Sequence, residues 1–144
     1  MKKPNDDLLL YGEDGSGRLA NPYYNFSSAA GIDYTIDISR EAGNRVSILG
    51  FSNGEPFLEE KTYTVAINSY RGNGGGGHLT EGAGIPGEEL AGRVSWSTDK
   101  DLRYHLMEYL RGKDTLIIEN TMNWHCIPTG WAKQAGELEK ERFN

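Results

Sequence analysis

The sequence predicts an α+β domain in which helices pack against an antiparallel or mixed sheet. Alternating polar and apolar residues predict strands near 32–38 and 63–68, and an apolar run predicts another at 46–51. Apolar residues at helical spacing between Leu102 and Leu110 predict a helix. Because short turns connect the strands and the helices follow them, we expect one layered α/β unit.

The composition fits a small globular domain and excludes several classes of protein. The 144 residues are 37% hydrophobic, which is enough for one core, and no apolar run is long enough to span a bilayer. A formal net charge of -6 disfavours the phosphate backbone of a nucleic acid as a partner. The single cysteine, Cys126, excludes an internal disulfide and a zinc site built from cysteines.

The first 22 residues show few signs of regular structure. A short apolar run at 8–11 leads into a turn-rich stretch at 12–17, so we expect a loop-rich start of a truncated domain at 1–22 and the domain proper at 23–144. The charged start at 1–3 resembles that of a signal peptide, but polar residues follow where an apolar stretch should be. We therefore expect no export signal in this chain.

The strand pattern is clearest from residue 32 onward. A turn at 40–44 joins the first two predicted strands as an antiparallel pair, and Asn53-Gly54 marks a tight turn after them. In the third, Tyr63, Val65 and Ile67 share one face. We expect these three strands to form an antiparallel meander.

The second half of the chain predicts two helices and a short strand. Thr98 is the expected N-cap of the first helix, and Arg111 with Gly112 is typical of its end. The apolar run 115–118 favours a strand, and the charged tail favours a helix.

Four consecutive glycines, 74–77, follow the third predicted strand. Such a run loses the most backbone entropy on ordering, so it indicates either a flexible linker or a place where a ligand lies against bare backbone. Gly72, Gly74 and Gly77 match the dinucleotide pattern G-x-G-x-x-G, but residues 78–86 cannot open the regular helix that this pattern needs. We do not expect a Rossmann site.

The histidines, the cysteine and one tyrosine each have a structural and a functional interpretation. His105 lies on the apolar face of the predicted helix, where a hydrogen-bonded core histidine is the default interpretation. A buried structural role is favoured for Cys126, because the side chain of His125 cannot face it along an extended segment. His78 fits a ligand contact or turn packing equally well. Tyr70 fits a stacking platform for a flat ligand or a core position.

Several ordered motifs carry a resemblance to a known family. Residues 31–46, 54–57 and 61–70, followed by the glycine run, resemble the C-terminal substrate-binding domain of the 5'-nucleotidases, a family that includes 2',3'-cyclic-nucleotide phosphodiesterases and UDP-sugar hydrolases. The resemblance covers most of residues 23–80.

The resemblance implies a part of a two-domain phosphohydrolase of nucleotide catabolism, periplasmic or at the cell surface. In that family a pair of divalent metal ions in an N-terminal metallophosphoesterase domain performs the hydrolysis, and the C-terminal domain stacks the nucleoside between two aromatic rings. One ring corresponds to Tyr70, and the other belongs to a segment upstream of this chain. The chain would then hold a nucleoside or nucleotide beside its own N-terminal domain, with no catalytic residue, metal or cofactor of its own.

The resemblance also names the substrate-binding residues. They are Tyr70, Arg71, Asn73, Gly74, Gly75, Gly76, Gly77 and His78. Gly76 stands where the family has an aspartate that accepts hydrogen bonds from the ribose, and His78 or Asn73 could replace that acceptor. Two alternatives stay open: a non-enzymatic module that binds a glycan or a protein, and a glycine run that binds nothing.

Overall fold

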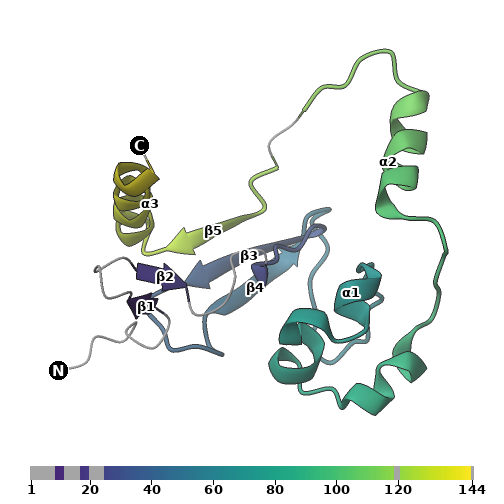
Figure 1. Ribbon diagram of the computed structural model, residues 1–144, viewed down its shortest axis with the longest axis horizontal. Helices are drawn as coiled ribbons and strands as arrows, with labels where there is room; N and C mark the ends of the chain where they lie inside the picture. The colour runs from purple at the N-terminus through teal and green to yellow at the C-terminus, as the bar shows by residue number, and fades with distance from the viewer. Residues whose placement is uncertain (1–8, 12–16, 20–24, 119–120, 144) are drawn as a thin grey trace.

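A three-stranded mixed sheet and several helices make up the part of the chain that the structure describes (Figure 1). The structure is a computed structural model and describes residues 9–11, 17–19, 25–118 and 121–143. The predicted α+β class is confirmed. In chain order the elements are β1 (Leu9–Tyr11), β2 (Gly17–Leu19), β3 (Ile32–Asp37), β4 (Val46–Phe51), α1 (Ser69–Gly72), the short helical turns η2 (Gly75–Gly77), η3 (His78–Gly82), η4 (Gly87–Glu89) and η5 (Ala91–Arg93), α2 (Leu102–Arg111), β5 (Trp124–Ile127) and α3 (Thr129–Phe143).

The sheet has the strand order β4-β3-β5. The predicted hairpin is confirmed, because β3 and β4 pair antiparallel, with Tyr34 opposite Ile48. The predicted meander is wrong, because residues 63–68 form no strand and β5 pairs parallel to β3 instead, with Tyr34 opposite Trp124. The alternation at 63–68 identified a segment able to form a strand, but alternation does not specify a partner.

Contacts around residue 34 explain why β5 takes the place beside β3. The Tyr34 and Trp124 rings stack with centroids 6.1 Å apart, and Phe26 lies 5.8 Å from Trp124. The Asn123 side-chain amide donates to the carbonyls of Ala29 (2.8 Å) and Ile32 (2.7 Å). These contacts join the start of β5 to the start of β3 across some ninety residues of sequence.

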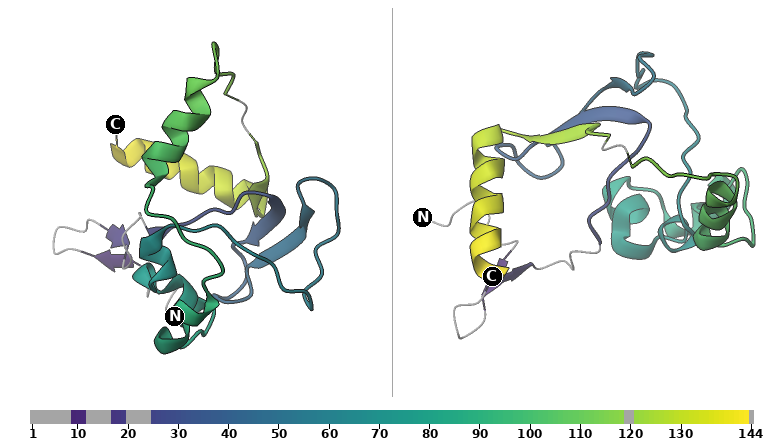
Figure 2. Two further views of the ribbon diagram at one scale, coloured as in Figure 1. Left: turned by 90° about the vertical axis from the view of Figure 1, so that its right-hand side faces the viewer. Right: turned by 90° about the horizontal axis from the view of Figure 1, so that it is seen from above.

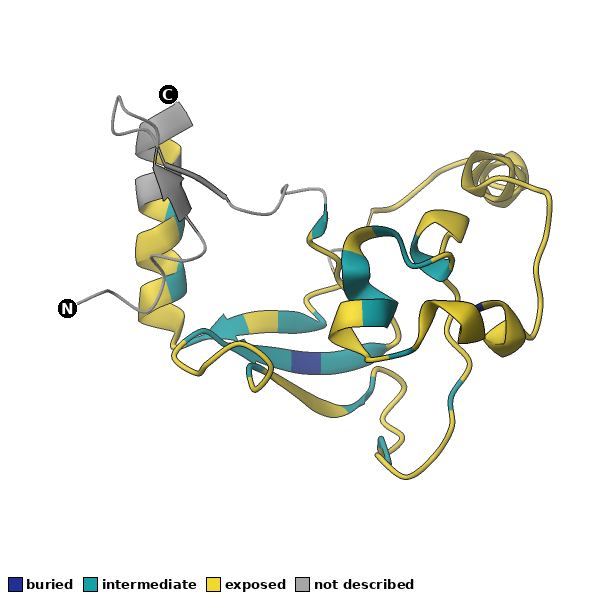
Figure 3. Cartoon of the chain, turned by 60° about the horizontal axis from the view of Figure 1, so that its bottom comes forward, coloured by how far each residue is buried: buried dark blue, intermediate teal, exposed yellow. Residues whose placement is uncertain are grey.

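Few residues are buried in the part of the chain that the structure describes. Tyr34 in the sheet and Leu90 after η4 are the buried hydrophobic residues of the described part. Most of the other residues there are exposed to solvent (Figure 3). A second aromatic cluster of Phe51, Phe57 and Tyr63 lies at the end of β4, with ring centroids 5.0–5.8 Å apart. The packing is therefore local rather than a single large core.

The predicted helix is confirmed as α2, with two corrections. Its N-cap is Asp101, whose Oδ1 accepts from the Tyr104 N–H at 2.8 Å, whereas the Thr98 hydroxyl accepts from Lys100. The core position predicted for His105 is wrong, because every residue of α2 is exposed. The helix stands apart from the sheet and α3, at the same end of the molecule as α1 (Figures 1 and 2).

The two ends of the chain also differ in part from the prediction. In the expected loop-rich start, β1 and β2 pair antiparallel, and residues 1–8, 12–16 and 20–22 lie outside the described part. The strand predicted at 115–118 is absent, whereas the helical tail is confirmed as α3. Cys126 is half-buried in β5 rather than fully buried, and it opposes Ile36 while His125 opposes Thr35.

Candidate functional site

The predicted site begins on α1, a single helical turn that follows residues 62–68, which form no helix or strand. Asn68 caps this turn, because its side-chain oxygen accepts from the Arg71 N–H at 2.9 Å. Residues 63–68 were predicted to be a strand that leads into the glycine run, but an Asn cap stabilises a helical start here instead. Tyr70 and Arg71 are thus presented by a short helix directly before the glycine run.

The four glycines form a defined turn. Gly74, Gly76 and Gly77 have φ values of 90°, 73° and 71°, in the left-handed region that favours glycine. Gly75 has no such φ, but a Cβ there would lie 2.6 Å from Cδ2 and Cε2 of Tyr70. Bare backbone is therefore required both by the path of the chain and by its close approach to the Tyr70 ring.

Tyr70 lies against this turn and faces solvent. The residue is 55% exposed, and the Arg71 Cζ lies 5.3 Å from the centroid of its ring. The ring is not sealed in the interior, so it is available to a flat ligand. A guanidinium near an aromatic ring is also a favourable cation–π arrangement.

Arg71 ties the glycine turn to a distant segment. Its Nη1 donates to the Gly75 carbonyl at 3.1 Å and to Asn25 Oδ1 at 3.2 Å. A Cβ on Gly76 would overlap Nη1 of Arg71 and lie 2.8 Å from Asn25 Oδ1. The side chains of Arg71 and Asn25 therefore occupy the volume that a side chain at position 76 would need.

The other predicted residues lie beside the same turn. His78 folds back over it, with Nδ1 3.1 Å from the Gly76 carbonyl, which is a turn-packing role. Asn73 is the exposed C-cap of α1, and its backbone N–H donates to Ser69 O at 2.9 Å. The turn thus brings all the predicted residues into one short stretch, and their substrate contacts stay a prediction.

Sequence reasoning missed Asn25 and Glu81. Asn25 precedes Arg71 by 46 residues, and no local spacing links the two. The Glu81 carboxylate lies 3.1–3.3 Å from the position of a Cβ on Gly77, one helical turn later. Spacing along η3 could have suggested Glu81, but only the fold brings Asn25 to the site.

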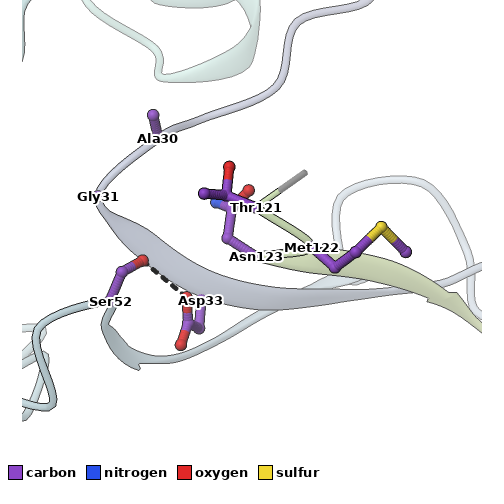
Figure 4. Close-up of a pocket in the computed structure, with 7 residues that line it drawn as sticks. All are labelled: Ala30, Gly31, Asp33, Ser52, Thr121, Met122 and Asn123. Carbon is purple, nitrogen blue, oxygen red and sulfur yellow. Dashed lines mark hydrogen bonds between the residues drawn. The ribbon is translucent and has the colours of Figure 1, made fainter. Parts of the chain in front are cut away.

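A separate cavity of about 370 Å³ lies beside the sheet (Figure 4). The Asp33 carboxylate on one side of it accepts from the Ser52 hydroxyl at 2.7 Å. None of the predicted site residues lines this cavity. Its lining residues are Ala30, Gly31, Asp33, Ser52, Thr121, Met122 and Asn123.

The described residues show neither a metal-binding cluster nor a membrane-spanning helix. Among them, no three His, Cys, Asp or Glu side chains gather in a group that could hold a metal ion. Within the same residues, no helix is both long and apolar enough to cross a membrane.

Comparison with known proteins gives the family. The model of the 5'-nucleotidase C-terminal domain matches residues 7–81, which is just over half of the chain. The chain belongs to this family. The resemblance inferred from the motifs is confirmed, and the matched residues of this 5'-nucleotidase C-terminal domain include the whole glycine turn with Tyr70 and Arg71.

The domain is also similar to a much longer curated protein. It is 26% identical over 119 residues to the trifunctional nucleotide phosphoesterase protein YfkN of Bacillus subtilis (strain 168). This similarity covers 73% of the chain but only 7% of the relative. No solved structure matches the chain.

Proposed function

We propose that this chain is the nucleoside-binding part of a two-domain, metal-dependent phosphohydrolase of the 5'-nucleotidase type. The observation that carries the proposal is the exposed ring of Tyr70 resting on bare glycine backbone, within residues that match the family. The similarity to a nucleotide phosphoesterase supports a nucleoside or nucleotide as the ligand. The parent enzyme would act in nucleotide catabolism, in the periplasm or at the cell surface.

The role proposed for the site is positioning. Stacking a base on an aromatic ring is worth about 1–3 kcal/mol, and it tolerates different bases because each has a π face. The Arg71 guanidinium beside the ring, with Asn73 and His78 on the turn, offers polar contacts to the rest of the nucleotide. Holding a substrate in one orientation lowers the barrier of the step that follows.

The hydrolytic chemistry is assigned to another domain. A pair of divalent metal ions in an N-terminal metallophosphoesterase domain would supply an activated water for attack on the phosphoryl group. The described residues of this chain do not fit such a pair, because they contain no group of three metal-ligating side chains. No step of the hydrolysis is therefore assigned to them.

A ligand titration tests the proposal. We expect adenosine and AMP to shift the NMR signals of residues 70–78, whereas simple sugars shift none of them. Tyr70→Ala should weaken adenosine binding about tenfold, because it removes the stacking surface, and Tyr70→Phe should preserve it. The purified chain should hydrolyse no phosphoester with any divalent metal. Sugar-dependent shifts, or adenosine binding that Tyr70→Ala leaves unchanged, would support the non-enzymatic module instead.

A further inference from the structure

The glycine turn lies between an aromatic ring and a carboxylate. A Cβ on Gly75 would lie 2.6 Å from carbons of the Tyr70 ring. A Cβ on Gly77 would lie 3.1–3.3 Å from Cδ and both carboxylate oxygens of Glu81. The Cα atoms of the two glycines are at most about 7.6 Å apart, because consecutive Cα atoms are about 3.8 Å apart. A ligand that stacks on the ring and extends along the bare backbone can therefore reach the carboxylate.

The Glu81 carboxylate has no partner within the described part of the chain. No donor there hydrogen-bonds to it, and no cation there forms an ion pair with it. It does not cap the start of η3 at Gly77, because the Gly77 N–H donates to the Gly74 carbonyl at 3.1 Å. Residue 81 is exposed, so its carboxylate is accessible to a ligand.

The other polar side chains at the turn are less suited to accept hydrogen bonds. The Arg71 guanidinium can only donate, and it already donates to the Gly75 carbonyl and to Asn25. The Nδ1 of His78 lies 3.1 Å from the Gly76 carbonyl, which can only accept, so one ring nitrogen is left as an acceptor. An ionised carboxylate has two acceptor oxygens and can accept from two neighbouring hydroxyls at once.

We infer that Glu81 accepts hydrogen bonds from the 2'- and 3'-hydroxyls of a nucleoside whose base stacks on Tyr70. Carboxylates hold ribose hydroxyls in unrelated nucleotide-binding folds. Hydrogen bonds to an ionised acceptor are about twice as strong as those between neutral groups. The inference rests on the proposed function, which places the base on Tyr70, and it assigns the acceptor to a residue other than His78 or Asn73.

This assignment also determines which substrates the site selects. A carboxylate attracts two free hydroxyls, whereas its negative charge repels a phosphate bound to the same oxygens. The site therefore prefers nucleosides and 5'-nucleotides with free 2'- and 3'-hydroxyls over 2',3'-cyclic or 3'-phosphorylated nucleotides.

NMR titrations with matched ligands and variants test the inference. The 144-residue chain should bind adenosine at least about fivefold more tightly than 2',3'-dideoxyadenosine, and it should bind 2',3'-cyclic AMP no more tightly than the dideoxy compound. Glu81→Ala should remove both differences. The control is Glu88→Ala, which removes an exposed carboxylate from η4 and should preserve both. The ratio between ligands excludes a purely structural effect, because a loss of folding weakens the binding of all three together.

The outcomes separate this inference from the proposed function. Equal binding of the three ligands by the unmodified chain, or a preference that Glu81→Ala leaves unchanged, would overturn the inference. If Tyr70→Ala still weakened adenosine binding in that case, the proposed function would stand without the role of Glu81. Adenosine binding that is absent, or that Tyr70→Ala leaves unchanged, would instead remove the proposed function and the inference with it.

Discussion

The backbone of Gly75 lies so close to the ring of Tyr70 that a Cβ there would sit 2.6 Å from two ring carbons. Real Cβ atoms do not approach so closely, so any larger residue at 75 has to displace the ring or the turn. The position of the ring and the bare backbone beside it therefore depend on each other.

Gly75→Ala should consequently disturb the site. A Cβ at 75 would also lie 2.5 Å from the Tyr70 carbonyl oxygen, so the turn has to shift as well as the ring. Overpacking of this kind costs about 1–3 kcal/mol, and we expect adenosine binding to weaken because both are displaced. Urea unfolding and a ligand titration measure the two effects. The control is Gly87→Ala, since a Cβ on Gly87 meets no atom within 4 Å. Equal stability and affinity for the two variants would show that the ring is not held by the turn.

The contact between Arg71 and Asn25 should couple two segments that are far apart in sequence. Asn25→Ala removes one acceptor of the guanidinium, and we expect a loss of about 1 kcal/mol in the free energy of unfolding. A double-mutant cycle with Arg71→Met should give a coupling energy of about 0.5–1.5 kcal/mol. Additive effects would mean that the two side chains act independently.

A matched pair of variants tests which residue caps the start of α2. Asp101→Ala should cost the helix about 1 kcal/mol, because it leaves the Tyr104 N–H without its cap. Thr98→Ala should change little, since the Thr98 hydroxyl accepts from Lys100 outside the helix. Circular dichroism and amide exchange along α2 distinguish them. A larger effect from Thr98 than from Asp101 would contradict the assigned cap.

The contribution of Asp37 to the stability of the fold should depend on pH. A hydrogen bond from the Ser39 hydroxyl, at 2.5 Å, is the largest cause that lowers the pKa of Asp37. Desolvation opposes this shift, whereas the Ser39 N–H and Arg40 add to it. Because the pKa is depressed in the folded state, the ionised carboxylate stabilises the fold above about pH 4. This contribution to the free energy of unfolding is lost as the pH falls through the pKa of the folded state.

Ser39→Ala should therefore raise the pKa of Asp37 toward its ordinary value. NMR titration of the Asp37 carboxyl carbon measures the shift directly. The same substitution at the exposed Ser95 should leave that pKa unchanged. A pKa that stays equally low without the Ser39 hydroxyl would assign the shift to other groups.

Local patterns in the sequence predicted local structure well. The alternation of 32–38 and the helical spacing of 102–110 identified β3 and α2, because these patterns reflect which face of an element is apolar. The pairing of Tyr34 with Trp124 was not predictable, since a parallel partner from the far end of the chain leaves no mark on spacing. Similarly, the glycine run and Tyr70 stood out in the sequence, whereas Asn25 reaches them only through the fold.

The overlap of position 76 with Arg71 has a consequence for any substitution that adds a side chain to Gly76. Introducing at position 76 alone the aspartate that the family resemblance implies would displace the Arg71 guanidinium from its position beside Asn25. The side chains of residues 71 and 76 thus compete for one small volume. A mutant library that varies one position at a time would miss double variants in which both side chains fit.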